Sequence, residues 1–423
     1  MFYHQALCPA GVADLEPTSS LKRSLSLPLL TFYGIGSIVG AGIYVLVGKV
    51  AGMAGVYAPL AFLVASALAV FSAFSYAELS ARYPLSAGEA VYVKHGLGAR
   101  GLPGAVGVML VAIGVVSGAT LIHGFAGYLR VFVALPDWFV LAALTLVLGA
   151  IVAWGITQSA LVAAAITIVE IGGLLVIVWV VPSQLGWERF VSMSWLPPAD
   201  IGMWVGVLSA AFVAFYAYVG FEDIVNVAEE VRDAPRTLPR AVIIALVVTS
   251  TLYLLVAVAS VAVIVPAELA ASDAPLALVY ERASGESPAF IALISLLSVV
   301  NGALIQIVMA SRVLYGMGRQ GWLPNWVARV HPRSRTPLAA TAMVTTLILL
   351  FALWLPLVTL ARLTSFVTLS VFALVNLSLW RIKRRDVGPA AAFNVPKWVP
   401  LVGFVVCTAF LIFQLALGVH QLD

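Results

Sequence analysis

Long apolar runs follow one another along the chain, and short polar stretches separate them. A helix that crosses the hydrocarbon core of a membrane needs about 20 mainly apolar residues. Eleven runs approach that length, at roughly 27–50, 55–80, 103–133, 138–155, 160–181, 203–229, 241–265, 288–315, 337–355, 358–380 and 398–419. The runs are continuous and do not alternate with a period of two, which excludes a transmembrane β-barrel. The pattern therefore predicts an all-α integral membrane protein.

Composition and loop length narrow the class of protein. Hydrophobic residues make up 62% of the 423 residues and charged residues 10%, whereas a soluble domain has about 45–50% apolar and about 25% charged residues. The longest loops, 182–202 and 266–287, are too short for a separate soluble domain. The sequence contains no Walker-A loop, HExxH motif or GxSxG elbow. We therefore expect a transporter and not an enzyme, without a cofactor or a metal.

The Lys and Arg residues predict the orientation in the membrane. With the N-terminus in the cytoplasm, 18 of the 23 Lys and Arg residues fall on the inner side, as the positive-inside rule requires. Residues 1–26 then form a cytoplasmic tail, and the net charge of +4 reflects topology and not nucleic-acid binding. We expect a multi-pass protein of the cell membrane, of the bacterial inner-membrane type.

Two of the predicted spans are interrupted by glycine. The first contains GIGSIVGAGIYVLVG, residues 34–48, and the second is AAFVAFYAYVGFEDIVNVAEEV, residues 210–231. They are the first and sixth spans, so they cross the membrane in opposite directions. Interrupted helices at matching positions of two halves are typical of inverted-repeat transporters. The predicted repeats are residues 27–181 and 203–380, with 398–419 as an additional eleventh helix.

A broken helix in a membrane offers unpaired backbone groups to a ligand. N–H groups at the start of one half carry partial positive charge, and C=O groups at the end of the other carry partial negative charge. A zwitterion with a carboxylate and an ammonium complements both ends. The alternative is that the glycines form a helix-packing face, and that Phe215 and Tyr216 are ordinary core residues.

Several quoted stretches resemble the amino acid–polyamine–organocation (APC) permeases. GIGSIVGAGIYVLVG is similar to their first-helix motif, and FYAYVGFEDIVNVAEEVRDAPRTLPRA is similar to their sixth helix and the loop after it. YAELSARYPLSAGEAVYV resembles the end of their second helix, and ASRVLYGMGRQGWLP followed by HPRSRTP resembles their eighth helix and its loop. The resemblance implies a LeuT-like fold with two inverted five-helix repeats and alternating access to a central site.

The resemblance also implies a site at the two breaks, with Ser37 to Gly42 as the unwound segment of the first helix. A substrate carboxylate would bind the N–H groups near Gly40, Ala41 and Gly42. The ammonium would bind carbonyls of both helices, and an aromatic residue next to the second break would cover the substrate. The residues implied are Ser37, Ile38, Gly40, Ala41, Gly42, Phe215, Tyr216, Ala217 and Val219.

The chain departs from the family pattern in two respects. Most members have twelve helices, and eleven are predicted here, which bears on oligomer contacts more than on transport. Many relatives have a lysine in the fifth helix at the position of Glu170, where sodium-coupled members of the fold bind a cation. Here a carboxylate takes that position.

Ionisable residues inside a membrane helix are costly and are functional candidates by default. Burial disfavours the charged form of Glu170, which would let it exchange a proton, coordinate sodium or attract a cationic substrate. It could equally be a neutral acid hydrogen-bonded between helices.

Each of the other polar candidates has more than one possible role. One of Glu222 and Asp223 would bond the broken helices or join an inner gate, while the other faces water. His123 is either a proton carrier or a packing residue. Asn301 either contacts substrate or holds helices together, and Ser298 is a weaker candidate for an ion-site hydroxyl.

The leading hypothesis is a secondary transporter of amino acids that works by proton-coupled symport or by exchange. The alternative is a carrier of polyamines or other cationic amines, in which Glu170 and Glu222 balance the ligand's charge. A non-transporting membrane sensor or scaffold is a more distant alternative. The expected partners are an amino acid, protons and the lipid bilayer, with no nucleic acid, and the chain is compatible with a homodimer.

Overall fold

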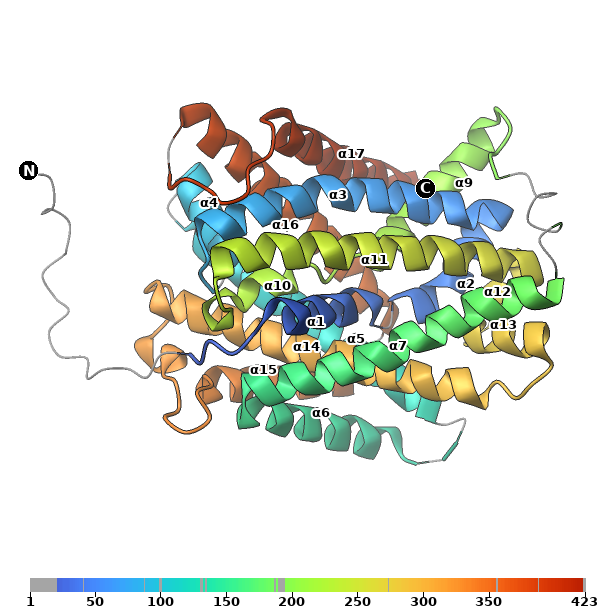
Figure 1. The fold of residues 1–423 in the computed structure, drawn as a ribbon, viewed down its shortest axis with the longest axis horizontal. Helices are drawn as coiled ribbons and strands as arrows, with labels where there is room; N and C mark the ends of the chain where they lie inside the picture. The colour runs from blue at the N-terminus through green and yellow to red at the C-terminus, as the bar shows by residue number, and fades with distance from the viewer. Residues whose placement is uncertain are drawn as a thin grey trace, which may run out of the picture.

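The fold is all-α. A computed structural model describes residues 21–420, except 41, 87, 99–100, 130–131, 134, 186–187, 189–194, 273, 355–356 and 387. The first half of the chain forms α1 (Leu27–Val39), α2 (Gly42–Ala54), η1 (Gly55–Tyr57), α3 (Ala58–Arg82), α4 (Gly88–Leu97), α5 (Leu102–Leu129), α6 (Asp137–Trp154) and α7 (Ile156–Leu185). Figure 1 shows the long helices running side by side along the long axis of the molecule.

The second half of the chain continues the same helical pattern. It forms α9 (Ile201–Tyr216), α10 (Asp223–Asn226), η2 (Ala228–Glu230), α11 (Ala234–Val263), α12 (Pro266–Ala271), α13 (Pro275–Ser284), α14 (Ala289–Arg319), η3 (Asn325–Ala328), α15 (Leu338–Trp354), α16 (Leu357–Arg385) and α17 (Trp398–His420). The described residues contain no strand, only one isolated parallel bridge between Leu25 and Val231.

The helices agree with the eleven apolar runs. Nine helical stretches of the described residues are long and apolar enough to cross a membrane, and Ile201–Tyr216 and Leu338–Trp354 are shorter apolar helices. Each predicted span contains one helix, except the two that are interrupted. The first span divides into α1 and α2, which lie end to end, and the sixth into α9 and α10, which lie toward opposite ends of the molecule (Figure 1). The predicted breaks in the first and sixth spans are confirmed.

The helices pack in two groups, with α1 between them. In one group α3 packs along α11 and α9, and α11 contacts α1. In the other α5 packs along α14, and α15 packs on both α5 and α6. Helix α7 contacts α1 on one side and α14 on the other. The two groups therefore meet along the first helix, where α1 also contacts α14.

The chain before α1 is joined to the chain after α10. The backbone N–H groups of Ser24 and Leu25 both donate to the Glu230 carbonyl at 3.0 Å, and the Arg232 N–H donates to the Leu25 carbonyl at 2.9 Å. These bonds satisfy backbone groups that would otherwise be buried without partners. As a result, the entry to the first span and the exit from the sixth form one unit.

Candidate functional site

The break in the first span is shorter than the sequence predicted. Ser37 and Ile38 belong to the last turn of α1, which ends at Val39, and α2 begins at Gly42. The backbone leaves the helix at Gly40, where ψ is −135°. The predicted unwound segment from Ser37 to Gly42 is therefore too long, because the helical hydrogen bonds of α1 continue to Gly40, whose N–H donates to the Gly36 carbonyl at 3.0 Å. Ala41 lies outside the described residues.

The Gly40 N–H is thus already paired within α1. The first N–H groups of any helix have no intrahelical acceptor. Gly42, the first residue of α2, is in this position and carries the partial positive charge of a helix start.

The break in the sixth span extends over residues 217–222. Between Tyr216 and Asp223 the backbone changes to turns with bonds between residues three apart, such as Val219 N–H to the Tyr216 carbonyl at 3.2 Å. Gly220 has a φ of +134°, a conformation that other residues avoid. The Glu222 carboxylate accepts from the Gly220 N–H at 2.8 Å. Glu222 therefore satisfies the backbone of its own helix at the break.

The two breaks fit into each other without space for a side chain. A Cβ added to Gly42 would lie 2.9 Å from the Ala217 Cα, and one added to Gly220 would lie 2.7 Å from the Ser37 carbonyl carbon. A Cβ on Gly36 would meet Thr167 and Asn301 at 2.1 and 2.5 Å. The packing face and the broken site, which the sequence offered as alternatives, are therefore the same surface.

Tyr253 of α11 joins the two breaks through one hydroxyl. It lies 2.6 Å from the Ile38 carbonyl and 3.0 Å from the Ala217 carbonyl. These are two of the carbonyls that the resemblance assigned to the substrate ammonium, one on each broken helix. Because a hydroxyl has one proton and a carbonyl two lone pairs, both carbonyls retain capacity for a second donor. The sequence analysis did not identify Tyr253, because it lies in a continuous apolar helix without a break or a charge.

Glu170 lies in a buried polar cluster between α7 and α14. Its Oε1 accepts from the Asn301 side-chain amide at 3.1 Å, and that amide also donates to the Thr167 hydroxyl at 3.0 Å. Ser298 lies next to the same carboxyl and donates to the Gly40 carbonyl at the break. The cluster therefore connects the Glu170 carboxyl to the first broken helix through Ser298.

Two oxygens of this cluster have no partner among the described residues, namely Glu170 Oε2 and Asn301 Oδ1. Both residues are fully buried. Buried polar atoms are nearly always hydrogen-bonded, so each exception needs an explanation. Two unpaired acceptors in one cluster suit a proton or a small cation. Asn301 therefore lies with Glu170, a placement that the sequence left open.

Asp223 contacts the first helix directly. Its carboxylate accepts from the Ser37 hydroxyl and, at 3.1 Å, from the Gln306 amide of α14. Asp223 and Glu222 are 1% and 4% exposed. The expectation that one of them faces water is therefore wrong, because Ser37, Gln306 and the Gly220 backbone supply the partners that water would otherwise provide.

The aromatic and histidine candidates differ in exposure. Phe215 is buried, and its ring lies 6.0 Å from that of Phe372. Tyr216 and Val219 are half-buried, and the Tyr216 hydroxyl lies next to Ser117 of α5. Of the two lid candidates, Tyr216 is the one with accessible surface. His123, on the same helix α5, is half-buried, and its Nε2 is unpaired among the described residues.

Buried charges close the end of the bundle beyond α10. Arg312 of α14 donates to the Glu230 carboxylate at 3.1 Å, and both side chains are fully buried. Tyr315 donates to Glu229 at 3.1 Å, and the Ser86 N–H donates to the same carboxylate at 3.2 Å. These bonds join α14 and the chain before α4 to the segment after the sixth span.

A further carboxyl, Glu89, lies at this closed end in α4. The Asn226 amide of α10 donates to it at 3.3 Å, while the Asn226 oxygen accepts from the Gly88 N–H at 3.2 Å. Burial raises the pKa of the Glu89 carboxyl from 4.5 to about 8, the Asn226 hydrogen bond opposes this rise in pKa, and the charge of Asp223 adds to it. Glu89 is thus protonated near neutral pH.

The sequence is similar to those of known permeases and transporters. The sequence model of a family described as amino acid permease matches residues 25–422. The branched-chain amino acid permease BcaP of Bacillus subtilis is 29% identical over 92% of this chain and 87% of its own length. The methylthioribose transporter of the same bacterium is 28% identical over 93% and 89%. Cationic amino acid transporter 3 of Arabidopsis thaliana is 28% identical over 85% of this chain and 62% of its own length.

A solved structure shares the fold. It is a sodium-coupled sialic acid symporter in a substrate-bound, outward-open state, with a TM-score of 0.59 and 13% sequence identity over 92% of this chain and 89% of that chain. At this level of identity the likeness concerns the fold alone. The LeuT-like fold that the motifs implied is confirmed.

We predict that Tyr253→Phe lowers both thermal stability and substrate affinity. Removal of the hydroxyl takes away the one proton that the Ile38 and Ala217 carbonyls share, which costs about 1–3 kcal/mol. It also loosens the contact between the two breaks. Tyr218→Phe is the matched control, because its hydroxyl donates to the Phe62 carbonyl at 3.1 Å, away from the first helix. Thermal unfolding and amino acid binding of both variants check this. Wild-type affinity in Tyr253→Phe would contradict it.

We predict that Glu89 makes the protein less stable as the pH rises from about 5 to about 8. The unfolded chain loses this proton near pH 4.5, whereas the folded chain keeps it up to about pH 8. Folding therefore takes up a proton in that interval, and stability falls with rising pH. Glu89→Gln should flatten the dependence of melting temperature on pH, and Glu281→Gln, at an exposed position, should not. Parallel curves for wild type and Glu89→Gln would show that Glu89 does not titrate in this way.

Proposed function

The chain belongs to the amino acid permease family, and from that premise we propose that it carries amino acids across the membrane by alternating access, driven by a proton gradient. The members of this family are permeases and not enzymes. The observation that carries the proposal is the pair of broken helices, which bring backbone donors of Gly42 and backbone acceptors of Ile38 and Ala217 to one place. Amino acids carry the matching carboxylate and ammonium.

Substrate binding would use the break as follows. The carboxylate accepts from the N–H groups at the start of α2 and interacts favourably with that end of the helix dipole. The ammonium donates to the free lone pairs of the Ile38 and Ala217 carbonyls beside Tyr253. Tyr216 covers the bound molecule, and the side chain extends toward α5 and α14. Glycine at position 42 lets the backbones approach, since the space beside Ala217 holds no Cβ.

Alternating access would follow from the packing. The repeats proposed from the sequence, 27–181 and 203–380, each contribute one broken helix, with 398–419 packed outside them. The end of the bundle closed by Arg312 and Glu230 is proposed to be the cytoplasmic end, because the basic residues gather there. Opening this end would require the Arg312–Glu230 ion pair to separate. Alternatively, Arg312 would move together with Glu230 and with segment 24–25, which is hydrogen-bonded to the Glu230 backbone.

The proposed coupling group is Glu170. A proton on Oε2 would convert an unpaired acceptor into a donor, in a cluster where Asn301 Oδ1 also needs a donor. Loss of that proton leaves a carboxylate with only the Asn301 amide and Ser298 to stabilise it, which is costly in a buried site. Ser298 connects this change to the Gly40 carbonyl at the break. Sodium is the alternative to a proton at the same oxygens. An uptake assay in which sodium is replaced by another cation distinguishes the two.

A cationic substrate is the second candidate. Asp223 and Glu222 are buried carboxylates at the end of the break in the sixth span. A side-chain ammonium or guanidinium of a substrate bound at the breaks would interact with Asp223. Similarity to cationic amino acid transporters of Arabidopsis thaliana supports this alternative. It concerns the class of substrate and leaves the coupling through Glu170 unchanged.

We predict that Glu170→Gln abolishes accumulation of an amino acid against its gradient in proteoliposomes with an imposed pH gradient. Glutamine keeps the size and the hydrogen bond to Asn301 but does not carry the proton. Binding and exchange between preloaded vesicles should persist, because the break is intact. Accumulation at the wild-type rate in Glu170→Gln would exclude Glu170 as the coupling group. Accumulation by the wild type that needs sodium and no pH gradient would assign the cluster to sodium.

Competition by leucine and by arginine decides between the two substrate classes. If the substrate is cationic, unlabelled arginine suppresses uptake, and Asp223→Asn weakens arginine binding by about tenfold or more because a buried charge loses its partner. If the substrate is neutral, leucine suppresses uptake, and Asp223→Asn leaves the leucine affinity within about twofold. No uptake of any amino acid under either a pH or a sodium gradient would contradict the transport proposal itself.

A further inference from the structure

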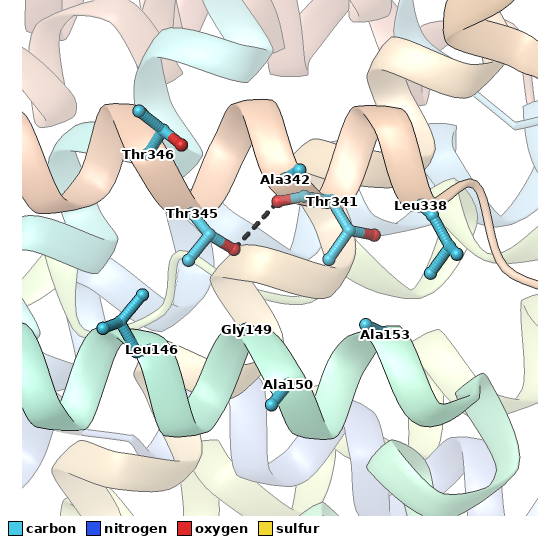
Figure 2. Close-up of a pocket in the computed structure, with 9 residues that line it drawn as sticks. All are labelled: Leu146, Gly149, Ala150, Ala153, Leu338, Thr341, Ala342, Thr345 and Thr346. Carbon is cyan, nitrogen blue, oxygen red and sulfur yellow. Dashed lines mark hydrogen bonds between the residues drawn. The ribbon is translucent and has the colours of Figure 1, made fainter.

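A groove and a pocket lie next to each other on the outer side of α6 and α15, away from the breaks. The groove has a volume of about 390 Å³ and is lined by Gly149, Ala150, Ala153, Thr341, Thr345 and neighbouring residues of the two helices. Figure 2 shows α6 and α15 side by side, with Thr341 and Thr345 pointing toward α6. At Gly149 the two helices touch, since a Cβ added there would lie 2.6 Å from the Thr345 methyl carbon.

The pocket continues the groove at the end of the two helices. It has a volume of about 620 Å³ and shares Ala150, Ala153 and Leu338 with the groove. Its lining carries the basic side chains Lys22, His331, Arg333 and Arg335. Among the described residues that line it there is no Asp or Glu. An apolar channel at membrane depth thus opens into a pocket of strongly positive character.

The loop that supplies the basic residues is fixed in place. The Thr336 hydroxyl donates to the Ala153 carbonyl at 3.1 Å, which attaches the loop to the end of α6. Within the loop the His331 N–H donates to the Thr336 carbonyl and the Arg335 N–H donates to the His331 carbonyl, both at 2.9 Å. These backbone contacts and the Thr336 hydroxyl hold the loop at the end of the groove.

One buried hydroxyl in the groove has no partner. Thr345 donates to the Thr341 carbonyl at 2.8 Å (Figure 2), but the Thr341 hydroxyl is unpaired among the described residues, and Thr341 is only 2% exposed. A hydroxyl between two membrane helices without a partner is unfavourable, since lipid chains offer no hydrogen bond.

We propose that the groove and the pocket together bind one anionic phospholipid. Its phosphate would lie in the basic pocket, and an acyl chain would fill the groove. Basic pockets between membrane helices are suited to anionic headgroups, and the apolar continuation excludes a small free anion as the whole ligand. The site is distinct from the amino acid site at the breaks and does not depend on the proposed transport activity.

The lipid would also connect two parts of the molecule. Lys22 precedes α1, whereas the other lining residues belong to α6, the residue after it and the chain of 331–338. Segment 24–25 is bonded to Glu230 after the sixth span. A phosphate shared by Lys22 and Arg333 would therefore hold the entry to the first span against the α6–α15 pair.

The test measures binding and stability in detergent micelles with added dioleoyl phosphatidylglycerol or dioleoyl phosphatidylcholine. We expect phosphatidylglycerol to raise the melting temperature, because it binds the folded state, and to be retained in native mass spectrometry. The double variant Arg333→Gln/Arg335→Gln should bind about thirtyfold more weakly, since each basic residue at an anionic surface contributes a factor of about five. Ala150→Trp keeps all charges but fills the groove, and should also lose retention.

The matched control is Arg232→Gln/Arg240→Gln, which removes two exposed charges from the same end of the bundle outside the pocket. It should keep the wild-type response to phosphatidylglycerol. The proposal is overturned if phosphatidylcholine stabilises the protein equally, or if Arg333→Gln/Arg335→Gln and Ala150→Trp both retain the lipid. It is also overturned if glycerol 3-phosphate at the same concentration gives the full rise in melting temperature, because the ligand is then a small anion.

Discussion

The structure depends on one requirement, that every backbone N–H and C=O group inside a membrane must have a partner. Two helices violate the regular pattern that normally meets this requirement, and neighbouring residues then compensate. The Tyr253 hydroxyl lies within hydrogen-bond distance of the Ile38 and Ala217 carbonyls. The Glu222 carboxylate accepts from the Gly220 N–H, and the Ser298 hydroxyl donates to the Gly40 carbonyl. Most of the polar residues near the centre of the bundle are therefore explained by the breaks before any ligand is considered.

The same requirement explains how much of this could be predicted from the sequence. The spans and the two breaks follow from apolar length and from glycines at matching positions, which are local properties of the chain. The partners of the breaks come from other helices, and which face of a uniformly apolar helix points inward is not encoded by its periodicity. Tyr253, Thr167 and Gln306 were missed for that reason. Glu170 was found because a charge in an apolar run is conspicuous, but its pairing with Asn301 depends on how α7 packs on α14.

Among the described residues, four buried carboxyls without a bonded Lys or Arg lie at three levels of the molecule. Glu170 lies beside the first break, Asp223 and Glu222 lie just beyond the second, and Glu89 lies at the closed end. Each has neutral hydrogen-bond donors nearby, such as Asn301, Gln306 and Asn226, and not a bonded Lys or Arg. Glu230 differs, because Arg312 pairs with it. Neutral donors tolerate both the charged and the protonated acid. The Arg312 charge favours the charged form of Glu230, but burial still raises the pKa of that carboxyl to about 7.

The hydroxyl of Tyr253 has a consequence for a carrier that crosses the membrane without cargo. In such a carrier the empty binding site has to pass through the closed state, and exposed acceptors would oppose this step by about 1–3 kcal/mol each. Because the single Tyr253 proton already serves one of the two carbonyls, the unloaded form is stabilised without the substrate. A net accumulating carrier needs this empty return, while an obligatory exchanger has to prevent it. Tyr253 therefore stabilises the closed breaks without a ligand, through a hydroxyl that belongs to the protein itself.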